Sequence, residues 1–176
     1  MKSQKNACTA VVVAAGTASR MRGIDKMLAP LNGQPVLLRT VRALAASSRI
    51  GQIIIVTRDD LLTAARALCG GEKKVCAVVP GGATRAESVL NGLRRVKTPV
   101  VAIHDGARPL VTPEVIDTAI SAAEKTGAAA PAVPVHDTIK IAEGGMVRAT
   151  PDRAALYAVQ TPQVFATERI RAALAD

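Results

Sequence analysis

Residues 9–31, TAVVVAAGTASRMRGIDKMLAPL, form an apolar run followed by a loop of very small residues, two arginines and a lysine. An uninterrupted apolar run of this length is typical of a strand that is buried on both faces of a sheet. Small residues after such a strand allow backbone N–H groups to approach an anion. The stretch therefore predicts a buried strand and a phosphate-binding loop at its carboxyl end.

The loop is neither of the two best-known nucleotide-binding loops. It lacks the G-K-[ST] of a P-loop, and Ala18 occupies the position of the second glycine in a G-x-G-x-x-G loop. Its distinguishing feature is a group of cations just beyond the small residues, namely Arg20, Arg22 and Lys26. A guanidinium can bind two phosphate oxygens at once, so this group suits a triphosphate.

Further apolar runs alternate with helical stretches along the chain. Thr84 and Glu87 predict a capping box at the start of one helix, and Thr112-Pro113 predicts the start of another. Alternating strands and helices predict an α/β three-layer sandwich with a mostly parallel, Rossmann-like sheet. The runs after the first are QIIIVT (52–57), KVCAVVP (74–80), TPVVAIHD (98–105) and AAAPAVPV (128–135).

Residues 136–153, HDTIKIAEGGMVRATPDR, interrupt this alternation. Two short strand-like segments flank EGG, which predicts a β-hairpin. The hairpin has few large apolar residues for a core of its own. It is either an arm that reaches over a site or another subunit, or a plain surface hairpin.

Ligands of such sheets bind at the carboxyl ends of the strands, so the residues after the apolar runs are the site candidates. Asp105 directly follows one run, within AIHDGARPL, and its carboxylate can hold Mg²⁺ between phosphates or simply cap a turn. In VPGGATRAESV, Gly81-Gly82 allows a flat base to approach, and Ser88 can read a base edge. A turn with a capping box accounts for the same residues without a ligand.

Composition excludes several classes of function. The chain has 176 residues, which is typical of one domain, and no run is long and apolar enough to cross a bilayer. The net charge is +9, yet a single Phe and a single Tyr leave little for base stacking, so no nucleic-acid partner is expected. Its three cysteines have no metal-ligand spacing, which indicates reduced thiols and a cytoplasmic protein.

Taken in order, these motifs resemble those of the 2-C-methyl-D-erythritol 4-phosphate cytidylyltransferases of isoprene biosynthesis by the non-mevalonate pathway. The resemblance runs from Val11 to QTPQVF (160–165), and it adds DTIK (137–140) and DRAALYAVQTPQVF (152–165) to the motifs above. It implies a nucleotidyltransferase sheet with a protruding β-arm at about residues 136–153. It also implies attack of a sugar-alcohol phosphate on the α-phosphorus of CTP, a Mg²⁺ cofactor, and a homodimer formed through the arm.

The resemblance also implies the roles of individual residues. Arg20, Lys26 and Arg153 are implied to be catalytic, the first two by stabilising charge on the reacting phosphates. Asp105 is implied to be the metal ligand, and Thr138 with Arg153 to position the methylerythritol phosphate. The residues implied to bind nucleotide or substrate are Ala14, Ala15, Gly16, Thr17, Ala18, Ser19, Gly81, Gly82, Ala83, Arg85, Ser88, Asp105, Gly106, Ala107, Arg108 and Thr138.

Some positions depart from the family's usual residues. Ala18 stands where glycine is usual, and Asp25-Lys26-Met27 where Pro-Lys-Gln is usual. Asp25 is expected to weaken the positive field at Lys26. The chain ends inside an apparent helix, TERIRAALAD (167–176), so the single domain 1–176 is expected to be truncated at its C-terminal end.

Two alternatives remain open from the sequence. A ribitol 5-phosphate cytidylyltransferase shares most of these motifs, although AAG (14–16) and HDGARP (104–109) favour the methylerythritol enzyme. A truncated domain that binds nucleotide but is inactive is the other alternative.

Overall fold

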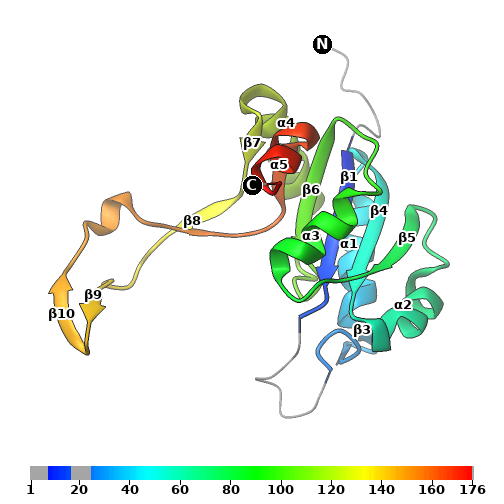
Figure 1. The fold of residues 1–176 in the computed structure, drawn as a ribbon, viewed down its shortest axis with the longest axis horizontal. Coiled ribbons are helices and arrows are strands. Elements are labelled where there is room, and N and C mark those ends of the chain that lie inside the picture. The colour runs from blue at the N-terminus through cyan, green and yellow to red at the C-terminus, as the bar shows by residue number, and fades with distance from the viewer. Residues whose placement is uncertain (1–7, 17–24, 176) are drawn as a thin grey trace.

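The computed structural model describes residues 8–16 and 25–175, and its centre is a six-stranded sheet (Figure 1). In spatial order its strands are β5 (Val75–Pro80), β4 (Ile50–Thr57), β1 (Cys8–Ala14), β6 (Val100–Asp105), β12 (Gln163–Ala166) and β7 (Ala128–Ala129). Strands β5, β4, β1 and β6 are parallel, whereas β12 is antiparallel to both of its neighbours. The chain first builds outward from β1 to β5 and then places β6 on the other side of β1, so the strand order reverses between β1 and β6.

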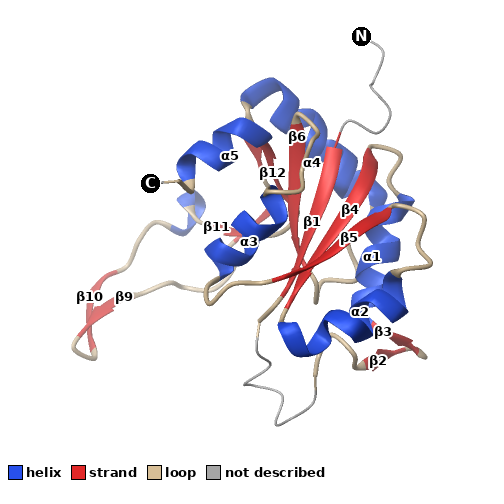
Figure 2. Ribbon diagram, turned by 45° about the vertical axis from the view of Figure 1, so that its right-hand side comes forward, coloured by secondary structure: helices blue, strands red, loops and turns tan. Residues whose placement is uncertain are grey.

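Helices cover both faces of the sheet, which confirms the predicted three-layer sandwich (Figure 2). One face packs against α1 (Val36–Ala46), α2 (Leu62–Cys69) and α4 (Pro113–Thr126). The other face packs against α3 (Arg85–Leu93) and α5 (Thr167–Ala173).

The two faces explain the uninterrupted apolar runs. Along β1, Val12 packs with α1 and α4, whereas Val11 packs with α3. Along β4, Ile53 and Ile54 alternate in the same way. Successive side chains of a strand point to opposite faces, so a strand covered on both faces needs an apolar residue at every position.

The predicted helix starts are confirmed at α3 and α4. The Thr84 hydroxyl accepts a hydrogen bond from the N–H of Glu87 at 3.1 Å, and the Glu87 carboxylate accepts one from the N–H of Ala83 at 2.7 Å. Pro113 opens α4, and that helix ends at Gly127, whose φ is 84°. These caps fix where each helix begins relative to the strand before it.

The prediction of one buried strand at residues 128–135 is wrong. The run splits into β7 at the sheet edge and β8 (Ala132–Pro134), which leaves the sheet and pairs with β11 (Tyr157–Val159). Pro131 and Pro134 have no N–H to donate, so they cannot continue a ladder inside a sheet. The position beside β6 is taken instead by β12.

The predicted β-arm is present and is longer than residues 136–153. Its base is the β8–β11 pair, and its tip is a hairpin of β9 (Ile141–Glu143) and β10 (Met146–Ala149). The turn at the tip is Gly144-Gly145, with φ of 57° and 80°, values typical of a two-residue hairpin turn. A 3₁₀ turn, η3 (Arg153–Ala155), lies in the returning segment, and the whole arm projects away from the sheet (Figure 1).

Three short elements complete the description. Strands β2 (Pro30–Leu31) and β3 (Gln34–Pro35) pair ahead of α1, and a 3₁₀ turn, η2 (Asp59–Leu61), joins β4 to α2. Among the described residues, none of the helices has the length and hydrophobicity needed to cross a membrane.

Candidate nucleotide site

A cavity of about 920 Å³ lies at the carboxyl ends of β1, β4 and β6, where the strand order reverses. This is the position at which open α/β sheets bind ligands. The cavity brings together most of the predicted binding residues: Ala15, Gly16, Lys26, Gly82, Ala83, Arg85, Ser88, Asp105, Gly106, Ala107 and Arg108.

The segment after β1 forms one wall of the cavity. Ala15 and Gly16 line it directly, whereas Ala14 is fully buried at the end of the strand. Lys26 also lines the cavity and is partly buried. The predicted loop residues Thr17, Ala18, Ser19 and Arg20 lie outside the described residues, as does Arg22.

The turn before α3 and the first residues of α3 form a second part of the cavity wall. The Ser88 hydroxyl donates a hydrogen bond to the carbonyl of Thr84 at 3.0 Å and accepts one from the N–H of Gly82 at 3.1 Å. Ser88 is only 2% exposed, so its hydroxyl holds the glycine turn against the helix. Because its proton is used in this way, Ser88 offers a ligand only a hydrogen-bond acceptor.

Asp105, at the end of β6, is held between two arginines. Arg85 donates to one carboxylate oxygen at 3.1 Å, and Arg108 donates to the other at 3.0 Å. Burial acts to raise the pKa of Asp105, but the hydrogen bonds from both guanidinium groups outweigh it and hold the pKa below its ordinary value. Asp105 is therefore ionised at neutral pH, and both arginines are already oriented around the cavity.

A buried histidine links the Asp105 loop to the returning arm segment. His104 Nε2 lies 3.1 Å from the carbonyl oxygen of Arg108, and Nδ1 lies 2.9 Å from the hydroxyl of Thr161. A carbonyl only accepts, so these partners assign the proton to Nε2 and leave Nδ1 to accept from Thr161. His104 is thus a neutral bridge that fixes the backbone of the loop carrying Asp105 and Arg108.

The two predicted arm residues are not brought into this cavity. Thr138 and Arg153 are exposed on the arm, which extends away from the sheet (Figure 2). The Arg153 guanidinium donates to the carbonyl of His136 within the arm, at 2.8 Å.

The profile of one protein family, described as IspD: 2-C-methyl-D-erythritol 4-phosphate cytidylyltransferase, matches residues 8–176. The chain belongs to the IspD family. Members of this family are cytidylyltransferases, a class of nucleotidyltransferase enzymes, so the predicted reaction is confirmed at the level of the family.

Individual relatives agree with this assignment. The chain is 46% identical over 159 residues to the 2-C-methyl-D-erythritol 4-phosphate cytidylyltransferase of Symbiobacterium thermophilum, covering 88% of this chain and 66% of that protein. It is 43% identical over 168 residues to the Cereibacter sphaeroides enzyme of the same name, covering 93% of this chain and 75% of that protein. The crystal structure of 4-diphosphocytidyl-2C-methyl-D-erythritol synthase from Anaerococcus prevotii superposes with a TM-score of 0.83 at 28% identity, covering 96% of this chain and 75% of that one.

Some residues of this IspD-family cavity were not predicted from the sequence. They include Val13, Met27, Arg58 and Thr84. Arg58 directly follows an apolar run, so the rule that site residues follow strands would have found it. Met27 gave no comparable indication, because its place in the cavity wall depends on packing against distant elements.

His104 should make the stability of the protein depend on pH. Burial, the largest effect, lowers the pKa of His104 below its ordinary value. Below about pH 6.5 the unfolded chain therefore binds a proton that the folded chain does not, and the free energy of unfolding should fall as pH decreases through this window. Urea denaturation at a series of pH values measures this slope.

The chain offers a matched control, because its second histidine, His136, is exposed on the arm. His104→Gln is expected to flatten the slope, and His136→Gln to leave it unchanged. If the slope persists without His104, the buried bridge is not its source.

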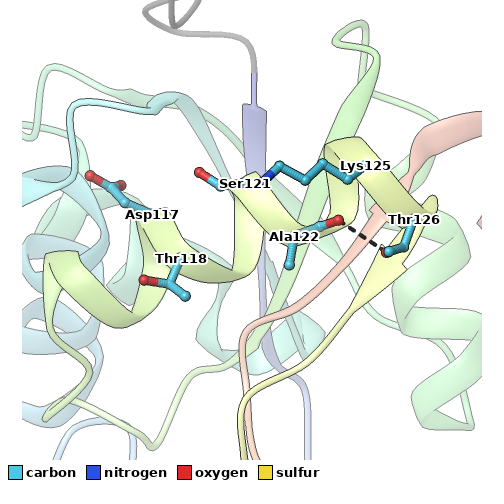
Figure 3. Close-up of a pocket in the computed structure, with 6 residues that line it drawn as sticks. All are labelled: Asp117, Thr118, Ser121, Ala122, Lys125 and Thr126. Carbon is cyan, nitrogen blue, oxygen red and sulfur yellow. Dashed lines mark hydrogen bonds between the residues drawn. The ribbon is translucent and has the colours of Figure 1, made fainter.

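A second hollow, of about 500 Å³, lies on the outward face of α4 (Figure 3). Asp117, Ser121 and Lys125 are among the residues that line it, and it shares no residue with the nucleotide cavity. Lys125 is exposed there. This face supplies a control position for substitutions in the cavity.

Proposed function

We propose that this chain itself carries out the family's reaction, the transfer of CMP from CTP to 2-C-methyl-D-erythritol 4-phosphate. The observation that carries the proposal is the cavity at the β1–β6 reversal, where Arg85 and Arg108 hold Asp105 and Lys26 lines the same cavity. A site with several cations, one carboxylate and a small-residue wall suits nucleotidyl transfer. In such reactions, positioning and charge stabilisation supply most of the catalysis.

In the proposed reaction an oxygen of the substrate phosphate attacks the α-phosphorus of CTP. A P–O bond forms there, and the bond from the α-phosphorus to the bridging oxygen breaks, so that pyrophosphate leaves with the bonding electrons. Lys26 and Arg20 stabilise the negative charge on the reacting phosphates. Gly82 lines the cavity at the start of the α3 wall, and the cytosine is placed against this Gly81-Gly82 turn.

The donor set also fits Mg²⁺, and Asp105 is the residue that would hold it. Its side chain is 33% exposed and lines the cavity, and Mg²⁺ is commonly held by one or two carboxylates together with substrate phosphates. When bound, the ion supplies neutralisation of the phosphate charge. Asp105 is ionised at neutral pH, and a bound ion would share its carboxylate oxygens with the guanidinium groups of Arg85 and Arg108.

The arm supports a homodimer. Met146 and Val147 at its tip are 68% and 60% exposed, and short hairpins are marginally stable when isolated. We propose that the arm packs on a second copy of the chain and brings Thr138 and Arg153 to the partner's cavity. These residues would then position the methylerythritol phosphate.

A cytoplasmic location is also part of the proposal. Cys8, Cys69 and Cys76 are all free thiols. Reduced cysteines are the rule in the cytosol.

Release of pyrophosphate tests the function directly. Purified protein with CTP, Mg²⁺ and methylerythritol phosphate should release pyrophosphate well above an Arg20→Ala control. Ribitol 5-phosphate in a parallel reaction should be turned over more slowly, and the reverse order would favour the ribitol enzyme. Stabilisation by CTP without product would instead identify a domain that binds nucleotide but is inactive.

The dimer makes a separate prediction. Replacing Met146 and Val147 by lysine should shift the protein from dimer to monomer in sedimentation velocity, because charged residues oppose burial of the arm. Turnover should fall with it, since Arg153 would no longer reach a partner's cavity. Val115→Lys, a similar change at an exposed residue of α4, should leave the dimer intact; a wild-type protein that sediments as a monomer would contradict the proposal.

A further inference from the structure

A tight turn carries Lys26 into the cavity. The side-chain carboxylate of Asp25 accepts a hydrogen bond from the N–H of Met27, with an N–O distance of 2.8 Å. The backbone carbonyl of Asp25 accepts from the N–H groups of Leu28, at 3.1 Å, and Ala29, at 2.9 Å. Asp25 is thus the residue that closes the turn, a role that aspartate often takes.

The same carboxylate pairs with Arg58, which lies directly after β4 and lines the cavity. Nη2 of Arg58 donates to Oδ2 of Asp25, and Nε of Arg58 lies 2.7 Å from a carboxylate oxygen of Asp60. The side chains of Asp25 and Arg58 are only 18% and 27% exposed. Salt weakens partly buried ion pairs less than exposed ones, so this pair should persist at physiological ionic strength. Because Arg58 directly follows β4, the pair links the Asp25 turn to the sheet.

Met27 fixes the other side of Lys26. It is 3% exposed and belongs to the core cluster between the sheet and α1. Its carbonyl accepts a hydrogen bond from the N–H of Leu37 at 3.0 Å. Its sulfur lies 3.2 Å from where a Cβ atom at Gly106 would be, beside the Asp105 loop. Lys26 is therefore held between a core residue and an ion-paired one.

We propose that Asp25 and Arg58 are positioning residues that act through Lys26. The inference rests on the proposed function, in which Lys26 stabilises charge on the reacting phosphates. Asp25 has two opposing effects, since its charge weakens the field at Lys26 while its bonds hold the turn. Arg58 already compensates that charge, so the positioning effect dominates.

Removing the Asp25 charge separates the two effects, because they predict changes in kcat/KM of opposite sign. Asparagine keeps an acceptor for the Met27 N–H but loses the ion pair, so Asp25→Asn raises kcat/KM if only the field matters. We expect Asp25→Asn and Arg58→Gln instead to lower kcat about 10- to 100-fold each. The double variant should be no worse than the worse single one, because both break the same pair.

Two further variants separate the ion pair from a general effect of charge near the cavity. Arg58→Lys keeps the opposite charge and should retain most of the turnover. Asp59→Asn removes one negative charge from an exposed neighbouring position and should leave kcat unchanged. An increase in kcat/KM for Asp25→Asn would overturn the proposal, as would equal losses in Asp25→Asn and Asp59→Asn.

Hydrogen exchange tests the pair without relying on activity. The amides of Met27, Leu28 and Ala29 should exchange about tenfold faster in Asp25→Asn and in Arg58→Gln than in the wild type, because the turn opens more often. Asp59→Asn should leave them unchanged. If the wild type releases no pyrophosphate, the proposed function fails, and the exchange result alone tests whether the Asp25–Arg58 pair holds the turn. Unchanged exchange in both variants overturns the proposal whatever the activity.

Discussion

Replacing Lys26 by glutamine is expected to lower kcat about 100- to 1,000-fold, the usual cost of removing one fixed donor from developing negative charge. Lys26 lines the cavity beside the small-residue wall of Ala15 and Gly16. Glutamine keeps much of the length and polarity of lysine but carries no charge, so the loss reports on the charge itself. Steady-state pyrophosphate release with varied CTP measures it.

The separate effects of Lys26→Gln on kcat and on KM show at which stage of the reaction Lys26 acts. An interaction made only in the transition state lowers kcat and kcat/KM equally, whereas one made equally with bound CTP raises KM alone. Lys125→Gln on the α4 hollow removes the same charge at a residue that does not line the cavity, and this variant should turn over CTP at the wild-type rate. If the two variants have equal kcat, Lys26 takes no part in the reaction.

The parallel part of the sheet could be predicted from the sequence. Residues such as Val11 and Val12 on β1, or Ile53 and Ile54 on β4, go to opposite faces, and each face is covered by helices. Burial on both faces requires an apolar residue at every position, and this requirement is local to each strand. The runs that became β1, β4, β5 and β6 were therefore recognisable individually.

The edge of the sheet could not be predicted in the same way. Strand β12 is short, and its place between β6 and β7 depends on pairing with residues far away in the chain. The apolar run at residues 128–135 resembles a core strand in composition, yet Pro131 and Pro134 prevent it from continuing in the sheet, and its second half enters the arm as β8. Composition alone does not distinguish these outcomes, because the partner strand decides them.

The candidate site shows the same limit. Asp105 could be predicted because it comes directly after the apolar residues of a strand, and it forms the carboxyl end of β6. Its hydrogen bonds with Arg85 and Arg108 were not part of that prediction. The His104–Thr161 bridge joins residues 57 positions apart, so nothing in HDGARP alone indicates it.

Asp25 shows why the charges near a site cannot be summed from the sequence. Its carboxylate was expected to weaken the positive field at Lys26. In the structure that carboxylate pairs with Arg58, which lies 33 residues away along the chain. The net effect of Asp25 at the cavity therefore depends on a contact that only the fold creates.

Gly92→Val is expected to lower the free energy of unfolding by at least about 3 kcal/mol. Gly92 lies on α3 where the helix crosses the sheet. A Cβ atom there would lie 2.5 Å from a methyl group of Val11 and 2.9 Å from one of Val56. Both valines are fully buried and β-branched, so they cannot readily change rotamer to make room.

Gly92→Ala separates packing from helix propensity, because the two predict changes of opposite sign in the free energy of unfolding. Gly92 is the next-to-last residue of α3, so propensity should stabilise Gly92→Ala by less than the value of about 1 kcal/mol that applies to an interior glycine, whereas overpacking costs about 1–3 kcal/mol. We expect destabilisation in urea unfolding followed by circular dichroism, since α3 must move away from β1. Gly71→Ala, where a Cβ atom meets nothing within 4 Å, should change stability by less than about 0.5 kcal/mol. A stabilised Gly92→Ala would mean that α3 can shift on the sheet. The positions of Arg85 and Ser88, which α3 carries to the cavity, would then be less rigidly fixed.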